Sequence, residues 1–304
     1  MRLDDFDPND INVGDQRGSG GGFGGGGGGG GLLFGLLPLI GSRFGCGGII
    51  VVLLLLAVFG GLGNLGSLVG GGSGVSSRPA ASAEGPQAVT AACTANPQSK
   101  AACNAFQSAQ RTWTAIFQQS GQQFQKPSLQ FYGGNGRSGC GAAQAAMGPF
   151  YCPTDQGIYL DTSFFDELAN RFGAKGDFAQ DYVIAHEFGH HIQNLLGTSE
   201  QVQRIQRSSS ETEGNAASVR LELQADCYAG VWAAQNRSRM EPGDLEEGLT
   251  AAQAIGDDTL QKQSQGRVVP DSFTHGTSAQ RQSWLQRGLQ TGDPAQCDTF
   301  SGAI

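Results

Sequence analysis

One long apolar run dominates the first third of the chain. From Gly47 to Gly63 the sequence reads GGIIVVLLLLAVFGGLG, and no charged residue occurs between Arg43 and Arg78. A helix needs about 20 mainly apolar residues to cross the hydrocarbon core of a membrane, and this part of the chain supplies them. A buried core helix fits less well, because flexible glycine and serine tracts flank the run. A cleaved signal peptide would need an unusually long polar start. We therefore predict an uncleaved transmembrane signal anchor over residues 45–69.

Composition on either side of this run predicts the remaining boundaries. Residues 1–44 are acidic at the start and then glycine-rich, with a dense glycine block from Gly18 to Gly31, which cannot build a core. We predict that they are disordered. Residues 70–90 contain GGSGVSSRPA and are typical of a flexible linker. Residues 91–304 are enough for one folded domain.

Apolar periodicity predicts that this domain is mostly helical. Residues from Asp177 to Leu196 carry apolar side chains at helical intervals and are followed by Gly197. Ser210 to Glu213 reads SETE, a capping box that opens a second long helix, and Pro242 to Ala254 predicts another. The clearest strand is Gly157 to Asp161. The expected fold class is α+β, mostly helical, with a small sheet.

The distribution of charge predicts the orientation of the span. Arg2, Arg17 and Arg43 precede it, whereas Arg78 is the only basic residue between it and Lys100. The positive-inside tendency then places the amino terminus in the cytoplasm and the large domain outside, as a single-pass inner-membrane protein with a periplasmic domain. The net charge of −8, without a basic stripe, argues against nucleic acid as a partner.

Cysteine usage points to the same compartment. Six of the seven cysteines lie in the C-terminal part, a number that suits three disulfides in an oxidising compartment. Sequence alone allows 15 pairings, and six buried thiols in a reducing compartment are the alternative.

The segment HEFGHH holds the strongest chemical signal. His186 and His190 are four residues apart on a predicted helix, so both imidazoles can reach one Zn²⁺ ion. Glu187 lies beside the first ligand, where it can act as general base toward a water at zinc. His191 points about 100° away from these histidines, which predicts a surface or core contact.

A catalytic zinc needs a third protein ligand. The segment RLELQADC places Glu222 and Asp226 one helical turn apart among apolar neighbours. We predict that Glu222 binds zinc and that Asp226 accepts the free ring N–H of a ligand histidine. A solvated acidic pair is the alternative reading. Glu213 is the second candidate ligand, although the capping box already accounts for it.

The fourth histidine, His275, lies in VPDSFTHGTS. It could donate a hydrogen bond to the oxyanion that forms during amide hydrolysis. A surface or capping histidine is an equal alternative from the residues alone.

The chain resembles a known family. Its glycine tract and single span, together with several long motifs, resemble the bacterial neutral zinc metallopeptidase family over nearly its whole length. The motifs are CGAAQAAMGPFYCP, IYLD, FAQDYVIAHEFGHHIQNLLG, RLELQADCYAGVWA, GRVVPDSFTHGTSAQR and GDPAQCDTF.

A more distant resemblance is to membrane-linked gluzincins related to CAAX prenyl proteases. In those enzymes HExxH is followed by a helix with Glu-x-x-x-Asp, and then by a histidine with an arginine six residues later. Glu222 and Asp226 match the first pair, and His275 and Arg281 match the second. The resemblance implies that His275 is the oxyanion donor, although Gly276 stands where those relatives usually have proline.

The resemblance also implies finer structure. Gluzincins bind the substrate backbone along an edge strand before the HExxH helix, a role that Gly157 to Asp161 would fill here unless it is an internal strand. We further expect three disulfides, which are Cys140–Cys152, Cys227–Cys297 and Cys93–Cys103.

The expected function is that of a membrane-anchored zinc peptidase acting on a peptide or protein substrate. A zinc-stabilised binding or scaffold domain of the envelope is the alternative. Hydrolysis of a non-peptide amide is a third reading, because metal and base act alike on any amide carbonyl.

Overall fold

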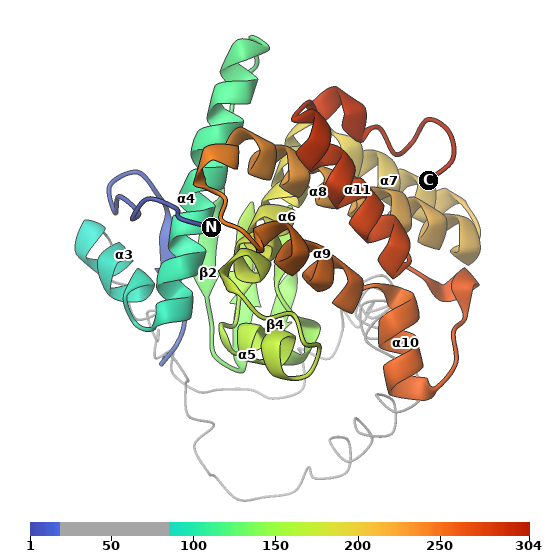
Figure 1. Ribbon diagram of the computed structural model, residues 1–304, viewed down its shortest axis with the longest axis horizontal. Helices are drawn as coiled ribbons and strands as arrows, with labels where there is room; N and C mark the ends of the chain where they lie inside the picture. The colour runs from blue at the N-terminus through green and yellow to red at the C-terminus, as the bar shows by residue number, and fades with distance from the viewer. Residues whose placement is uncertain (19–84) are drawn as a thin grey trace, which may run out of the picture. The chain divides into compact units, whose positions relative to one another are not determined.

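Two long helices, α6 (Asp177–Leu195) and α8 (Glu211–Gln235), form the centre of the compact unit that contains residues 85–304. The computed structural model describes residues 1–18 and 85–304. Adjacent helices run in Figure 1 from α4 at the left through α6 and α8 to α11 and α7 at the right. The other described helices are α3 (Pro86–Cys93), α4 (Pro97–Gln119), α5 (Ser163–Asn170), α7 (Thr198–Ser208), α9 (Asp244–Ala254), α10 (Asp257–Gln265) and α11 (Ser278–Thr291).

Helix α6 is buried on nearly all sides because it packs against α4, α8 and α9. It begins at Asp177, as predicted from the apolar intervals. The predicted capping box at the start of α8 is also present. Ser210 Oγ accepts from the Glu213 backbone N–H at 3.3 Å, and the Glu213 carboxylate accepts from the Ser210 N–H at 3.0 Å. The helix expected from Pro242 begins at Asp244. The fold is mostly helical with a small sheet, as expected for an α+β protein.

Among the described residues, the main sheet has four strands in the order β1-β2-β6-β5. β1 (Val13–Asp15), β2 (Ser128–Phe131) and β6 (Gly157–Leu160) are parallel, and β5 (Phe150–Cys152) is antiparallel to β6. A separate hairpin joins β3 (Asn135–Ser138) to β4 (Gly141–Gln144).

The predicted strand at Gly157 exists, and of the two places that the sequence left open for it, the structure shows the internal one. Strand β6 is internal, because β2 and β5 occupy both of its hydrogen-bonding edges. Its residues are all buried, which fits a strand covered on both sides. The edge strand on this side of the sheet is β5.

The expectation of disorder from residue 1 to 44 is wrong for residues 1–18. These residues belong to the same compact unit as residues 85–304, and β1 extends the sheet. Helix α3 likewise begins at Pro86, inside the predicted linker 70–90. Local composition suggested flexibility in both places, whereas contacts with distant residues order them.

The three expected disulfides are all present, namely Cys93–Cys103, Cys140–Cys152 and Cys227–Cys297. Within residues 1–18 and 85–304, no helix has the length and apolar character needed to cross a membrane. The predicted span at residues 45–69 lies outside the described residues.

Candidate metal centre

Three predicted metal ligands meet where α6 faces α8. His186 and His190 project from successive turns of α6, and their ring centroids lie 4.8 Å apart. Glu222 of α8 faces both rings. Its Oε2 lies 3.1 Å from His186 Nε2, and its Oε1 lies 3.4 Å from His190 Nε2. The sequence prediction that these three side chains converge is therefore met.

The spacing of these atoms fits a zinc ion. Ligands at about 2.0–2.2 Å from a tetrahedral zinc lie about 3.3–3.6 Å from one another. The observed separations of 3.1 and 3.4 Å are close to that range, and the three candidate ligand atoms all lie within 4.8 Å of one another. Two imidazoles and one carboxylate also form a donor set that zinc prefers at catalytic sites.

The second nitrogen of each imidazole is held by an acceptor. Asp226 Oδ1 lies 2.8 Å from His186 Nδ1, and Gln193 Oε1 lies 2.8 Å from His190 Nδ1. Because an acceptor at Nδ1 keeps the proton there, Nε2 is left with its lone pair for a metal. Sequence reasoning found Asp226 but missed Gln193. Its position three residues after His190, on the same helix face, was the available signal.

Asp226 is the centre of a buried polar network. The carboxylate is fully buried and accepts from Tyr182 Oη at 2.6 Å. Arg281 of α11 donates to both carboxylate oxygens, at 2.8 Å from Nε and 2.9 Å from Nη2. Burial raises the pKa of Asp226, but Arg281 and His186 outweigh it and hold that pKa below its usual value. The role of Arg281, which the sequence left open, is to neutralise Asp226.

The carboxylates make the site favourable for a cation. Burial raises the pKa of Glu222, but the two histidines outweigh it and hold that pKa well below its usual value. Burial lowers the pKa of His186, whereas Asp226 and Glu222 raise it to about 9. Glu222 and Asp226 thus carry negative charge in a protein interior, where a positive ion is strongly stabilised.

A glycine inside the motif allows the two helices to approach. A Cβ atom on Gly189 would lie 3.0 Å from the Ala225 carbonyl oxygen. Ala225 lies between Glu222 and Asp226 in sequence, so a side chain at position 189 would crowd the stretch of α8 backbone that carries these carboxylates. The HEFGH segment therefore supplies close packing as well as candidate ligands.

Glu187, the predicted general base, is 7% exposed. Within the part of the chain that the structure describes, its carboxylate has no hydrogen-bond partner. Burial raises the pKa of Glu187, in spite of the neighbouring histidines, which lower it. A buried carboxylate with a raised pKa and free lone pairs is suited to taking up a proton and releasing it.

His275 reaches the site from the loop before α11. Its side chain is 31% exposed, and its Nδ1 lies 3.2 Å from Asp257 Oδ1. Asp257 also accepts from the backbone N–H of His275 at 2.6 Å. Burial lowers the pKa of His275, but Asp257 and Glu222 outweigh it and raise that pKa. Asp257, which sequence reasoning missed, therefore orients the ring through Nδ1, and within residues 1–18 and 85–304 Nε2 has no hydrogen-bond partner.

Gly276, the residue after His275, occupies the position at which the gluzincin pattern usually has proline. Gly276 has φ +86°, a conformation that proline cannot adopt because its ring fixes φ near −65°. The turn therefore differs from one built with proline. Arg281 nevertheless reaches Asp226 from the first turn of α11.

His191 makes contacts in the core, which is one of the two roles predicted for it. It is fully buried, and its Nε2 donates to the Gln125 carbonyl at 2.7 Å. Its Nδ1 accepts from Tyr151 Oη at 3.0 Å. Burial lowers the pKa of His191 to about 4, so the ring is neutral.

The described residues hold a second group with metal-ligand spacing, formed by Asp177, Asp244 and Glu247. The amino group of Met1 lies 2.9 Å from Asp177 and 3.2 Å from Asp244. This group is made of carboxylates alone, without an imidazole.

Comparison with known proteins supports the same assignment. Residues 4–300 match the family described as "Putative neutral zinc metallopeptidase". The uncharacterized protein YpfJ of Escherichia coli strain K12 is 58% identical over 195 residues, which are 64% of this chain and 68% of that protein. The uncharacterized protein Rv2575 of Mycobacterium tuberculosis strain H37Rv is 46% identical over 194 residues, which are 59% of this chain and 64% of that protein. No solved structure matches. With nearly the whole chain matched and the His186, His190 and Glu222 group in place, the chain belongs to this family of zinc metallopeptidases.

Proposed function

We propose that this protein is a zinc peptidase of gluzincin-like architecture, which hydrolyses peptide bonds with His186, His190 and Glu222 as metal ligands. The observation that carries the proposal is the orientation of the two imidazoles. Both Nδ1 atoms face acceptors while both Nε2 atoms face Glu222. Such an arrangement favours a metal over a simple ion-paired cluster.

Zinc held by these residues would lower the pKa of a water molecule and would polarise the scissile carbonyl. Glu187 accepts a proton from the attacking water and passes it to the nitrogen of the leaving amine, so the peptide C–N bond breaks while a C–O bond forms. The raised pKa of Glu187 matches both halves of this transfer.

His275 donates from Nε2 to the carbonyl oxygen as negative charge develops there. Asp257 holds the ring through Nδ1, and its negative charge raises the pKa of His275 and so favours the protonated imidazole. A donor held in advance does not need to reorganise in the transition state.

The substrate backbone binds along β5 in this proposal. Strand β5 pairs with β6 on one side and, among the described residues, has no strand on the other. It packs against α6, and Tyr151 in this strand contacts His191 next to His190. An extended peptide added to this edge would run beside the metal ligands.

We also propose that the protein is attached to a membrane and that its zinc domain lies outside the cytoplasm. Three disulfides support an oxidising compartment, and the apolar run at residues 45–69 supports attachment. The alternative of a structural zinc in a scaffold domain is less well supported, because structural sites use four protein ligands and the described group offers three.

The test compares Glu187→Gln with wild type in metal analysis and in cleavage of a peptide library. Glu211→Gln makes the same chemical change at an exposed glutamate and serves as the matched control. We expect all three proteins to bind one zinc, while only Glu187→Gln loses cleavage. Zinc in all three proteins with no cleavage by wild type would support the scaffold function instead.

A further inference from the structure

The amino-terminal segment, residues 1–18, is built into the sheet of the zinc domain. Strand β1 pairs in parallel with β2, with Val13 opposite Leu129. The Leu129 N–H donates to the Asn12 carbonyl at 2.9 Å, and the Gln16 N–H donates to the Phe131 carbonyl at 2.7 Å. Backbone bonds of this kind need both strands in one aqueous compartment.

Arg17, at the end of this segment, forms hydrogen bonds with two helices. Its guanidinium donates to Ser99 Oγ of α4 at 2.6 Å and to the Ala92 carbonyl of α3 at 2.7 Å. It also pairs with Asp15 at 2.7 Å and lies 4.4 Å from the centre of the Phe131 ring. The last basic residue before the glycine tract is therefore fully engaged within the folded domain.

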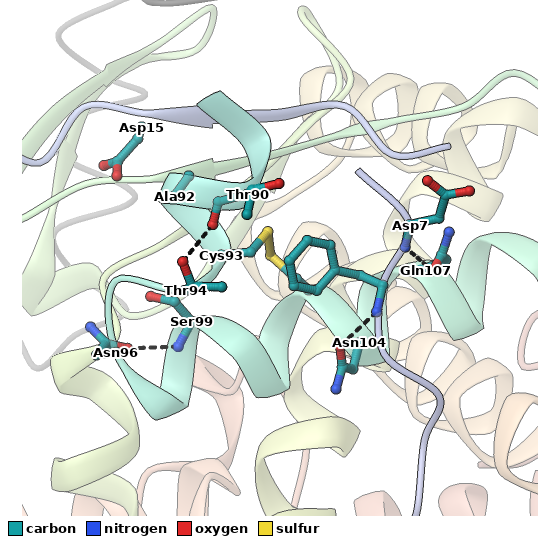
Figure 2. Close-up of a disulfide and its surroundings, with 12 residues drawn as sticks. Asp7, Asp15, Thr90, Ala92, Cys93, Thr94, Asn96, Ser99, Asn104 and Gln107 are labelled. Carbon is teal, nitrogen blue, oxygen red and sulfur yellow. Dashed lines mark hydrogen bonds between the residues drawn. A yellow bond between two sulfur atoms is a disulfide. The ribbon is translucent and has the colours of Figure 1, made fainter. Parts of the chain in front are cut away.

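The first half of the segment is fixed against α4 and against the loop that follows α4. The backbone N–H of Asp7 donates to Gln107 Oε1 at 2.8 Å, and the Asp10 carboxylate pairs with Lys126 at 2.6 Å. Ile11 is 6% exposed. Figure 2 shows the hydrogen bond between Asp7 and Gln107. The acidic residues that suggested disorder are thus partners of the domain surface.

These contacts change the interpretation of the charges around the apolar run. Arg2 and Arg17 were counted as cytoplasmic in the positive-inside argument. Arg2 pairs with Glu241 at 2.7 Å, and Arg17 is held as described above. Because both are ion-paired to the folded unit, only Arg43 is left to favour a cytoplasmic amino terminus.

We propose that residues 1–18 lie on the same side of the membrane as the disulfide-bearing zinc domain and form a permanent strand of it. A single crossing would separate residues 1–18 from residues 85–304 and would break every contact above. Residues 18 and 85 therefore lie on the same side of the membrane. This proposal does not rest on peptidase activity.

Thiol labelling of the full-length protein in spheroplasts tests the proposal. Asn12→Cys places an exposed thiol on the segment, and Ser209→Cys places one on the domain, each combined with Cys46→Ser. We expect a membrane-impermeant maleimide to label both variants to the same extent before lysis. If lysis is needed for both, the shared side stands and the proposed location outside the cytoplasm fails. Labelling of one thiol without the other before lysis overturns the proposal.

A crosslink tests the strand pairing itself. Gly14 and Gln130 are register partners, and a Cβ atom on Gly14 would touch the Gln130 side chain. We expect Gly14→Cys with Gln130→Cys to form a disulfide in cells, seen as a linked peptide pair in non-reducing peptide mapping. Gly14→Cys with Ser209→Cys is the control and should give no such pair. Free thiols at positions 14 and 130 in folded, zinc-binding protein would contradict the pairing.

Discussion

Replacement of Asp226 by asparagine tests the buried network behind the metal centre. Oδ1 of Asp226 accepts from Tyr182, His186 and Arg281, and Oδ2 accepts from Arg281. Asparagine has nearly the same shape, but its amide group would face a donor in either orientation. Arg281 is only 2% exposed and would lose its counterion.

The expected effect follows from the burial of that guanidinium. Removal of one partner from a buried ion pair costs about 3–5 kcal/mol of folding free energy. For a domain of this size each kcal/mol lowers the melting temperature by about 2–4 °C, so Asp226→Asn should melt about 6–20 °C below wild type. Zinc affinity should fall about 10–100-fold, because His186 is held less firmly. Melting is recorded after chelation, so that zinc binding does not contribute.

A double variant separates stability from zinc affinity. Asp226→Asn with Arg281→Met removes both charges, and the amide can still accept from His186 and Tyr182. Most of the lost stability should return, because no buried charge lacks a partner. Zinc affinity should stay low, because a neutral acceptor holds the imidazole more weakly than a carboxylate does. The reasoning is refuted if Asp226→Asn melts within about 2 °C of wild type. Recovery of both properties would mean that Asp226 affects zinc only through stability.

Three further changes probe other parts of the site and its support. Gln193→Ala should lower zinc affinity about 10–100-fold, because His190 Nδ1 loses its acceptor; unchanged affinity in a chelator competition would argue against this. Cys227→Ser with Cys297→Ser opens a loop that spans a sequence separation of 70, so thermal denaturation should report a loss of about 4 kcal/mol rather than none. His275→Ala should lower kcat about 10²–10³-fold in peptide hydrolysis with zinc content unchanged, and a loss of zinc would instead make it a structural residue.

Local signals in the sequence predicted the helices that form the site. The histidine spacing and the capping box are properties of a few neighbouring residues, and both appear in the structure. Glu222 and Asp226 could be predicted because they also share one helix face. The partners Tyr182 and Asp257 could not be ranked above other polar residues, since their roles depend on how separate helices pack. Gln193, by contrast, lies three residues after His190 on the same helix, a local signal that was missed.

Two features of the fold could not be predicted from local sequence, and for the same reason. The position of a strand within a sheet depends on pairing with distant residues, so nothing local distinguished an internal β6 from an edge strand. The order in residues 1–18 likewise comes from contacts with α4 and β2, more than 80 residues later in the chain. A segment rich in aspartate has little apolar area of its own to bury, so its composition alone suggests disorder.

The position of Arg281 and Cys297 has a consequence for biosynthesis. Arg281, which pairs with Asp226, lies 55 residues later in the sequence, and Cys297, which is bonded to the neighbouring Cys227, lies 70 residues after Cys227. Contacts of such long sequence separation form late, because both partners must first be made. A nascent chain that already contains His186 and Glu187 therefore lacks the supports of the finished metal centre. The metal centre would therefore gain these supports only after Arg281 and Cys297 have been made.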